Sequence, residues 1–178
     1  MHDSAREALW LLRAQSGDRE ALERLLAAAR GIVRRYVAPI VGISDVDDVT
    51  QDVLFLVYRK LAWLEEPELF RPWVYRVATR AAFRHLKKSN RWRETSLDEV
   101  REDVVAIEDV PPSIVEELLT APGISPASRA VMVLHFQEGM TLPDAAAVLG
   151  IPTGTAKSRL AYGLAKLRAH LRQFKEFV

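Results

Sequence analysis

The chain of 178 residues carries 25 Lys and Arg against 24 Asp and Glu, 49% hydrophobic residues and no cysteine. That length allows one domain or two small ones, and the hydrophobic content supports a folded core and excludes global disorder. The lack of cysteine excludes disulfides, thiolate zinc sites, iron–sulfur clusters and thiol catalysis; the four histidines are scattered, so we expect no metal and no cofactor.

No apolar run approaches the roughly 18 residues that a membrane-spanning helix needs, and the acidic residues among the first twenty are not typical of a signal peptide. We therefore expect a cytoplasmic protein. Residues 1–93 hold 17 basic and 12 acidic groups, residues 94–119 hold one and nine, and residues 120–178 hold seven and three. Two basic blocks around an acidic strip indicate two modules on a linker and favour a polyanionic partner.

The hydrophobic period is helical almost throughout, without convincing alternation of period two, and predicts an all-α fold. Gly17-Asp18 is expected to divide the first stretch into two helices. Ser44-Asp45 predicts an N-cap for a helix from Val46 to about Leu64, and two prolines bracket the start of the next helix, from about Phe70 to Asn90.

The acidic stretch that ends at Pro111-Pro112 is interpreted as the linker. The predicted organisation is therefore two helical domains joined by an acidic linker, with residues 1–93, 94–112 and 113–178 as its three parts. In the last part we expect helices near residues 113–119, 126–137, 142–149 and 153–174.

The C-terminal module carries the most specific local pattern. Thr141-Leu142-Pro143-Asp144 predicts a capped helix, Gly150 supplies the left-handed residue of a tight turn, and a second helix begins about three residues later. This spacing is typical of a helix-turn-helix, whose second helix enters the major groove of DNA. The candidate DNA contacts are Gly154, Thr155, Lys157, Ser158, Arg159 and Tyr162. The alternative is a solvated surface helix, because short helix-turn-helix matches are common.

The helix from Val46 predicts two faces. One is apolar, and the other presents Asp48, Gln51, Asp52 and Phe55 at i, i+3, i+4 and i+7. An exposed aromatic residue among acids suggests a basic protein partner. Alternatively, Phe55 belongs to the core and the acids are favoured by the helix dipole. Both interpretations remain open at this point.

The following helix is strongly basic, with eight basic residues and no acid between Arg71 and Arg93. Basic groups interleaved with aromatic rings suit contact with a nucleic-acid backbone and stacking on its bases. We assign Trp73 to the core and leave Trp92 open as a stacking residue. The candidate DNA-binding residues here are Tyr75, Arg76, Arg80, Phe83, Arg84, Lys87, Lys88 and Arg91.

Together these segments resemble the sigma-70 family of RNA polymerase sigma factors, in its small extracytoplasmic-function (ECF) type. Residues 47–53 with Phe55 are similar to the family segment D-L-x-Q-[DE]-V-F, which docks on the polymerase. Residues 70–78 are similar to the promoter-melting segment F-x-x-W-L-x-x-I-A, and residues 142–159 to the −35-reading helix-turn-helix that opens its second helix with G-T-V-K-S-R.

The resemblance implies a transcription initiation factor without enzymatic activity. Such a factor binds core RNA polymerase, on the β′ clamp helices and the β flap, and directs it to promoter DNA. The resemblance assigns polymerase docking to the acidic face with Phe55, −10 binding to the basic helix and −35 binding to the helix after Gly150. An anti-sigma factor is a usual partner. The acidic linker is either a mimic of nucleic acid inside the polymerase or a solvated tether.

Some residues depart from the family pattern. Thr79, Arg80 and Arg84 stand where the family usually has R-N and then an acid. Tyr162-Gly163 replaces Arg-Ala, and glycine in a helix interior costs about 1 kcal/mol relative to alanine. The family's promoter preferences are therefore not carried over. The alternative function is a stand-alone helix-turn-helix regulator, which accounts for the C-terminal pattern but for neither N-terminal face.

Overall fold

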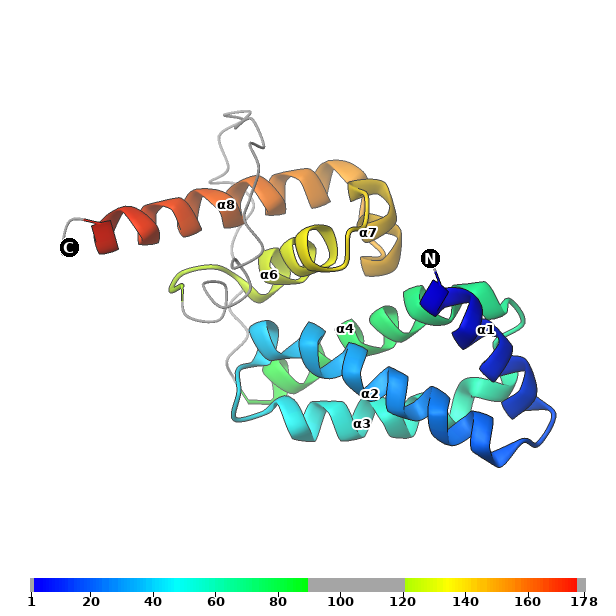
Figure 1. Cartoon of the computed structure of the whole chain (residues 1–178). Coiled ribbons are helices and arrows are strands. Elements are labelled where there is room, and N and C mark those ends of the chain that lie inside the picture. The colour runs from blue at the N-terminus through cyan, green and yellow to red at the C-terminus, as the bar shows by residue number, and fades with distance from the viewer. Residues whose placement is uncertain (1, 90–120, 176–178) are drawn as a thin grey trace. The chain divides into compact units, whose positions relative to one another are not determined.

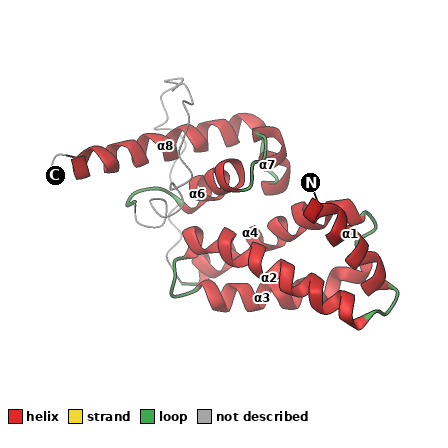
Figure 2. Cartoon of the chain, in the orientation of Figure 1, coloured by secondary structure: helices red, strands yellow, loops and turns green. Residues whose placement is uncertain are grey.

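The computed structural model describes residues 2–89 and 121–175. The chain divides into two compact units, Met1–His85 and Leu86–Val178. In the described ranges every regular element is helical (Figure 2), as the hydrophobic period predicts. The predicted linker and the helix expected near residues 113–119 lie outside the described residues.

The N-terminal unit consists of helices that lie against one another, and its longest helix, α2, packs against both α1 and α3 (Figure 1). Its elements are α1 (His2–Gln15), α2 (Arg19–Val41), α3 (Val46–Lys60), the 3-10 turns η1 (Leu61–Trp63) and η2 (Pro67–Leu69), and α4 (Phe70–Lys88). The predicted extension of α3 to residue 64 is replaced by η1, after which Leu64 is extended, with ψ 101°.

The break between α1 and α2 follows the prediction from Gly17-Asp18. Gly17 has a φ of +93°, a conformation that side chains with a Cβ rarely adopt. Asp18 then caps α2, because its carboxylate accepts the Ala21 N–H at 3.0 Å. Arg13 donates two hydrogen bonds to the same carboxylate, at 2.9 and 2.6 Å. The cap therefore also ties the end of α1 to the start of α2.

The start of α3 differs from the predicted cap. Asp45 occupies the N-cap position, but its side chain makes no capping hydrogen bond. Its φ and ψ of −110° and −3° are near-helical, whereas a capping carboxylate needs an extended backbone. The Asp45 carboxylate instead lies 2.8 Å from Nε2 of His85 on α4. The residue thus links two helices instead of satisfying the first N–H groups of its own.

The core of the N-terminal unit is built from branched aliphatic and aromatic residues at helical spacing. Those of α2, α3 and α4 include Val33, Tyr36, Val37, Val49, Val53, Val57, Val74, Tyr75, Ala78 and Ala82, all at most 1% exposed. The rings of Tyr36 and Tyr75 meet edge to face, with centroids 5.2 Å apart. This burial holds α4 firmly against α2, so the outer side of α4 is a fixed surface.

The C-terminal unit contains α6 (Pro126–Met132), a π-helical turn η4 (Val133–Gln137), α7 (Leu142–Leu149) and α8 (Thr153–Lys175) among its described residues. Residues 126–137 were predicted as one helix and instead change to π geometry at Val133. Ser125 caps α6, since its hydroxyl accepts the Ser128 N–H at 3.1 Å. Leu160, Leu164 and Leu167 bury the inner side of α8.

Candidate nucleic-acid and protein interfaces

The turn between α7 and α8 has the predicted helix-turn-helix geometry. The hydroxyl of Thr141 accepts the Asp144 N–H at 3.3 Å and donates to the Asp144 carboxylate at 2.6 Å, which caps α7. Gly150 is left-handed, with φ 67° and ψ 38°. The Ile151 N–H donates to the Ala146 carbonyl at 3.0 Å, which closes the end of α7. Three residues therefore separate the two helices, and α8 begins at Thr153.

The predicted residues in the first three turns of α8 differ in their exposure to solvent. Gly154 and Lys157 are exposed, whereas Thr155, Ser158, Arg159 and Tyr162 are partly buried. The Ser158 hydroxyl donates to the Gly154 carbonyl at 3.1 Å, so its lone pairs are the groups left for an incoming donor. Burial lowers the pKa of the Arg159 guanidinium, which nonetheless stays charged at neutral pH.

The Tyr162 ring is paired with a cation on the same helix. The Lys166 ammonium lies 5.4 Å from the ring centroid, one turn further along α8. A cation over the ring fixes the side-chain position. Its neighbour Gly163 is buried, and a Cβ there would clash with Sδ of Met132 on α6. The glycine that departs from the family pattern is therefore the point where the Met132 side chain of α6 packs against α8, so a side chain there would require Met132 to shift.

The exposed face of α3 decides between the two interpretations of Phe55. Asp48, Gln51 and Asp52 are exposed, and Phe55 is 58% exposed, so the assignment of Phe55 to the core is wrong. Neither aspartate forms an ion pair with another described residue. The Arg59 guanidinium lies 5.5 Å from the Phe55 ring centroid. α3 thus presents carboxylates around an aromatic ring to solvent.

Two details of this face were not predicted. The family segment places its aromatic residue directly after the valine, which is the position of partly buried Leu54; the exposed ring stands one residue later. Tyr58 is absent from the predicted set although it is 57% exposed. Its spacing of three residues from Phe55 places it on the same face, one turn further along.

The basic helix α4 presents most of its predicted residues to solvent. Arg76, Arg80, Arg84, Lys87 and Lys88 are exposed, and Phe83 is partly buried. Trp73, assigned to the core, is also only partly buried, with its ring centroid 6.3 Å from that of Phe70. Arg91 and Trp92 lie outside the described residues. The exposed cations of the described part of α4 form a stripe on its outer side, which we call the α4 stripe: Arg76, Arg80, Arg84, Lys87 and Lys88.

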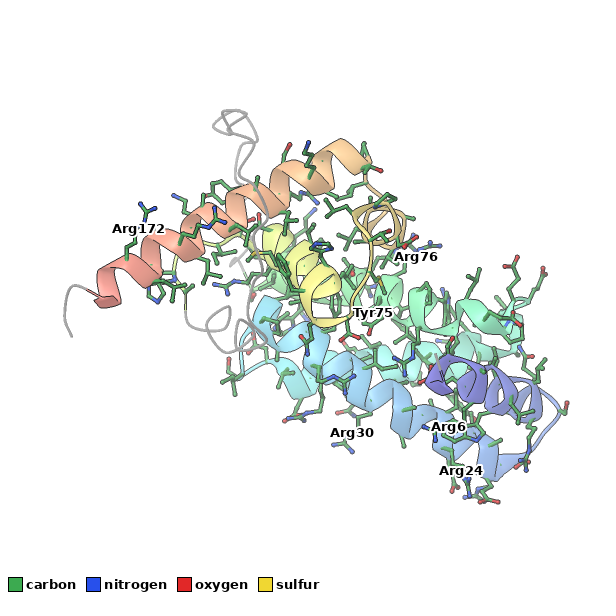
Figure 3. The ribbon with its side chains drawn as sticks, turned by 45° about the horizontal axis from the view of Figure 1, so that its top comes forward. Arg6, Arg24, Arg30, Tyr75, Arg76 and Arg172 are labelled. Carbon is green, nitrogen blue, oxygen red and sulfur yellow. The ribbon has the colours of Figure 1, made fainter. Side chains whose placement is uncertain are left out.

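Tyr75 does not belong to this stripe, and its assignment to DNA binding is wrong. Its side chain is 1% exposed and packs edge-on against Tyr36. Arg76 is the next residue, and a helix turns 100° between neighbours, so one side chain enters the core while the other leaves it (Figure 3). Thr79 is also buried; its hydroxyl lies 2.6 Å from that of Tyr36.

Two further features bear on what these surfaces can bind. Across the described ranges, no helix is both long and apolar enough to cross a membrane. Within the same ranges, no group of three or more His, Asp or Glu side chains is arranged to hold a metal ion. The described surfaces are acidic and aromatic on α3, cationic on α4, and mixed polar and cationic on α8.

Models of known families match both units in order. The model described as Sigma-70 region 2 matches residues 21–93, and the model described as Sigma-70, region 4 matches residues 123–169. The chain belongs to the sigma-70 family. The first match contains α3 and α4, and the second contains the helix-turn-helix. The stand-alone regulator accounts for the second match alone.

Several sigma factors are similar to the chain over most of its length. The RNA polymerase sigma factor NccH of Alcaligenes xylosoxydans xylosoxydans is 29% identical over 172 residues, which are 90% of this chain and 91% of the relative. The ECF RNA polymerase sigma-E factor of Escherichia coli K12 is 26% identical over 174 residues, with the same two shares. The chain spans only 42% of a third relative, the probable RNA polymerase sigma factor RfaY of Xanthomonas campestris pv. campestris, at 25% identity.

Solved structures agree with this assignment. CnrH, in complex with the cytosolic domain of CnrY, aligns with a TM-score of 0.66 and 26% identity over 94% of this chain and 98% of that one. The sigma factor RpoE of Bartonella quintana, in complex with the anti-sigma factor NepR, aligns with a TM-score of 0.64 and 20% identity, over 84% of this chain and 96% of that one, and supports the fold alone. This sigma factor is of the ECF type and serves promoter-directed transcription initiation by RNA polymerase.

Proposed function

We propose that the exposed face of α3 is the surface by which this sigma factor docks on the β′ clamp helices of core RNA polymerase. Asp48, Gln51, Asp52 and Phe55 form its centre, and Tyr58 extends it by one turn. Carboxylates without an intramolecular ion partner among the described residues can pair with a basic partner at little reorganisation. The exposed rings supply the apolar area that a stable interface buries.

The α4 stripe is the proposed contact with the −10 element. Its cations can follow the phosphates of an opened strand, and partly buried Phe83 remains a candidate for stacking on a base. Tyr75 is left out because it belongs to the core. The basic side chains on this helix increase affinity for any strand, so base preference must come from the few residues that reach base edges.

The first turns of α8 are the proposed contact with the −35 element. Lys157 and Tyr162, with Ser158 between them, would meet base edges, while Arg159 and Thr155 lie nearer the phosphates. The same unit would contact the β flap of the polymerase. In this proposal residues 1–93 and 113–178 act as the −10 and −35 domains, and residues 94–112 connect them.

The factor itself performs no chemistry in this proposal; catalysis belongs to the polymerase that it recruits. It acts in the cytoplasm, where the polymerase and the promoter are. We also propose that an anti-sigma protein holds the free factor. The support is the family resemblance, in which an anti-sigma factor is a usual partner, together with the structure of CnrH in complex with the cytosolic domain of CnrY.

The observation that carries the docking proposal is the 58% exposure of Phe55 on an acidic face. The test is the affinity of the purified chain for core polymerase, measured by fluorescence anisotropy. Asp48→Ala combined with Asp52→Ala should weaken binding at least about tenfold, since two charge pairs at the interface are lost. Glu65→Ala combined with Glu68→Ala is the matched control, because these two carboxylates are also exposed and also form no ion pair with another described residue.

Equal losses in the two double variants would show that overall charge, and not the α3 face, governs the affinity. Unchanged binding in the Asp48 and Asp52 variant would place the docking surface elsewhere on the chain. Circular dichroism of each variant distinguishes both outcomes from loss of the fold.

A further inference from the structure

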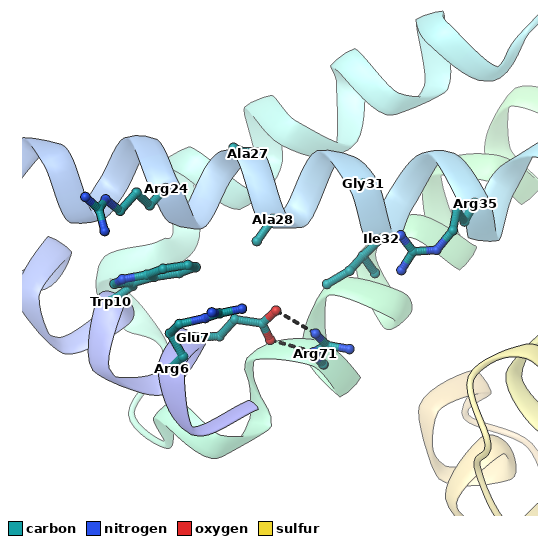
Figure 4. Close-up of a pocket in the computed structure, with 10 residues that line it drawn as sticks. All are labelled: Arg6, Glu7, Trp10, Arg24, Ala27, Ala28, Gly31, Ile32, Arg35 and Arg71. Carbon is teal, nitrogen blue, oxygen red and sulfur yellow. Dashed lines mark hydrogen bonds and ion pairs between the residues drawn. The ribbon is translucent and has the colours of Figure 1, made fainter. Parts of the chain in front are cut away.

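We propose that a groove between α1, α2 and α4, which we call the arginine groove, binds an acidic segment of a partner protein. The groove has a volume of about 590 Å³ and is lined by ten residues: Arg6, Glu7, Trp10, Arg24, Ala27, Ala28, Gly31, Ile32, Arg35 and Arg71. Figure 4 shows the α1 side chains facing α2, with Arg24 and Arg35 toward opposite ends. This inference goes beyond the polymerase and promoter surfaces proposed above.

The groove exists because α2 presents small residues to α1. Ala27, Ala28 and Gly31 form its floor, and together they leave the space that larger side chains would fill. A Cβ built on Gly31 would meet only Nη1 of Arg35, at an ordinary 3.7 Å. The space above Gly31 is thus open, and the backbone there would accept a side chain.

The charges of the groove are unbalanced. Glu7, which is 3% exposed, is fully engaged by Arg71, whose Nε and Nη2 lie 2.6 and 2.8 Å from its two carboxylate oxygens. Arg24 is paired with exposed Glu20 on its own helix, at 2.6 Å, a pair that is worth little in water. Arg35 forms no ion pair with any described residue. The lining therefore carries an excess of positive charge in a concave surface, which concentrates its field.

The dimensions suit an extended peptide. Arg24 and Arg35 are eleven residues apart on one helix, which at 1.5 Å per residue separates them by about 16 Å. An extended chain covers that distance in about five residues, at roughly 3.3 Å each. Two carboxylates at the ends of such a segment can each meet a guanidinium, while the residues between them lie over the small side chains of the floor.

The composition of the groove favours a peptide over a nucleotide or a polyphosphate. The Arg6 guanidinium lies 5.3 Å from the centroid of the Trp10 ring, so this face of the ring is covered and cannot stack on a base. Trp10 and the alanines of the floor offer an apolar surface, which an aliphatic side chain can bury and a phosphate chain cannot. The Glu7–Arg71 pair already shows a carboxylate bound in this groove by a two-pronged guanidinium contact.

The arginine groove is a separate surface from the α3 face and from the α4 stripe. No residue of α3 lines it. Arg71 and Arg80 are nine residues apart on α4, which is two and a half helical turns, so the groove and the α4 stripe lie on opposite sides of that helix. A segment bound in the groove would therefore leave the α3 face and the α4 stripe uncovered.

The test is binding of a fluorescein-labelled hexapeptide of four glutamates and two leucines to the full chain at physiological salt, followed by anisotropy. Arg35→Glu and, separately, Gly31→Leu should each weaken binding about tenfold or more, the first by reversing a charge of the groove and the second by filling it. Arg30→Glu is the matched control, because Arg30 is exposed on the same helix, points away from the bundle in Figure 3 and does not line the groove. We expect the peptide affinity of the Arg30→Glu variant to stay within about twofold of that of the parent chain.

Three results would overturn the proposal. One is an absence of saturable binding by the peptide. Another is an equal loss in the Arg30 and Arg35 variants, which would show attraction to overall charge. The third is tighter binding of tripolyphosphate, ATP or a single-stranded oligonucleotide at the same residues, which would reassign the groove to phosphates. Affinity for core polymerase is measured on the same variants and should be unchanged, so failure here is distinguishable from failure of the docking proposal.

Discussion

The hydroxyl oxygens of Tyr36 and Thr79 lie 2.6 Å apart in the core of the N-terminal unit. Thr79 donates to the Tyr75 carbonyl at 2.8 Å, so the Tyr36 hydroxyl must be the donor to Thr79. Burial raises the pKa of Tyr36 well above its ordinary value, which keeps it a neutral donor. The three residues form a buried chain of hydrogen bonds that joins α2 to α4.

These hydrogen bonds explain a departure from the family pattern. Thr79 stands where the family usually has an arginine, and it is 5% exposed. At that depth an arginine would bring an unpaired charge beside Tyr36. The threonine is thus a core residue of this chain, and the basic character of α4 comes from the exposed residues on either side of it.

The loss of unfolding free energy should depend on which hydroxyl of the pair is removed. Tyr36→Phe leaves Thr79 bonded to the Tyr75 carbonyl and should lower the free energy of unfolding by about 1 kcal/mol. Thr79→Val leaves the tyrosine hydroxyl buried without a partner and should lower it by about 1–3 kcal/mol. Urea unfolding followed by circular dichroism measures both. The double variant should lose less than the sum; strict additivity would show that the two hydroxyls are not coupled.

Gly163→Ala tests the close approach of α8 to α6. Helix propensity alone predicts a gain of about 1 kcal/mol in unfolding free energy, but the new Cβ would clash with Sδ of Met132. We expect a net loss of about 1–3 kcal/mol in unfolding free energy from overpacking, measured by urea unfolding. Gly154→Ala on the same helix is the control, since a Cβ there meets nothing within 4 Å, and it should be neutral or stabilising.

A second substitution separates packing from propensity in this experiment. Met132→Val shortens the side chain that the new methyl group meets. Combined with Gly163→Ala it should recover part of the loss, because the two changes act on one contact. A stabilising effect of Gly163→Ala by itself would mean that Met132 moves aside at little cost.

Lys157→Ala tests the proposed reading of the −35 element. Lys157 is exposed at the start of the second turn of α8. If it contacts base edges, its loss should reduce initiation from a promoter with an intact −35 element by about 1–3 kcal/mol, and much less on a scrambled element. In vitro transcription with polymerase saturated by the variant provides the measurement. Equal losses on both promoters would reassign Lys157 to phosphate contact.

Asp18 predicts an acid-sensitive contribution to stability. The Ala21 N–H and then the Arg13 guanidinium lower the pKa of its carboxyl below the ordinary value. A lowered pKa stabilises the fold above the unfolded pKa of about 3.9, and this contribution is lost as the pH falls through the folded value. The difference in unfolding free energy between the parent chain and Asp18→Ala should therefore be full at neutral pH and shrink below about pH 4.

The measurement is urea unfolding of both proteins at neutral and at acidic pH. Asp18→Asn is the informative companion, because an asparagine can still cap α2 but does not titrate. The difference in unfolding free energy between Asp18→Asn and Asp18→Ala should not change with pH. A difference between parent and Asp18→Ala that is constant with pH would show that the cap, and not the charge, carries the effect.

Several features of this sigma factor could be predicted from the sequence because their causes are local. Helical period, the break at Gly17-Asp18, the cap at Thr141 and the left-handed Gly150 depend on residues within one or two turns of each other. Those interactions are present wherever the segment folds, so the helix-turn-helix follows from its own residues. The family assignment, too, rests on three short segments in order.

Other features were decided by packing between helices. The exposure of Phe55 depends on which face of α3 the rest of the unit covers, and the amphipathic pattern allowed either answer. Tyr75 was assigned to DNA because aromatic and basic residues alternate on α4, whereas Tyr36, thirty-nine positions away in the sequence, buries it. The Asp45 carboxylate likewise contacts His85 on another helix instead of capping α3 as predicted.

The sequence by itself determined the helices, the turn before α8 and the family, since each depends on neighbours along the chain. The tertiary structure alone decided which side chains are surface and which are core. It made Gly163 a packing requirement through Met132, buried Thr79 against Tyr36 and assembled the arginine groove from three helices. These outcomes depend on distances between residues that are remote in sequence, and a helical period specifies only the direction of a side chain, not what lies opposite it.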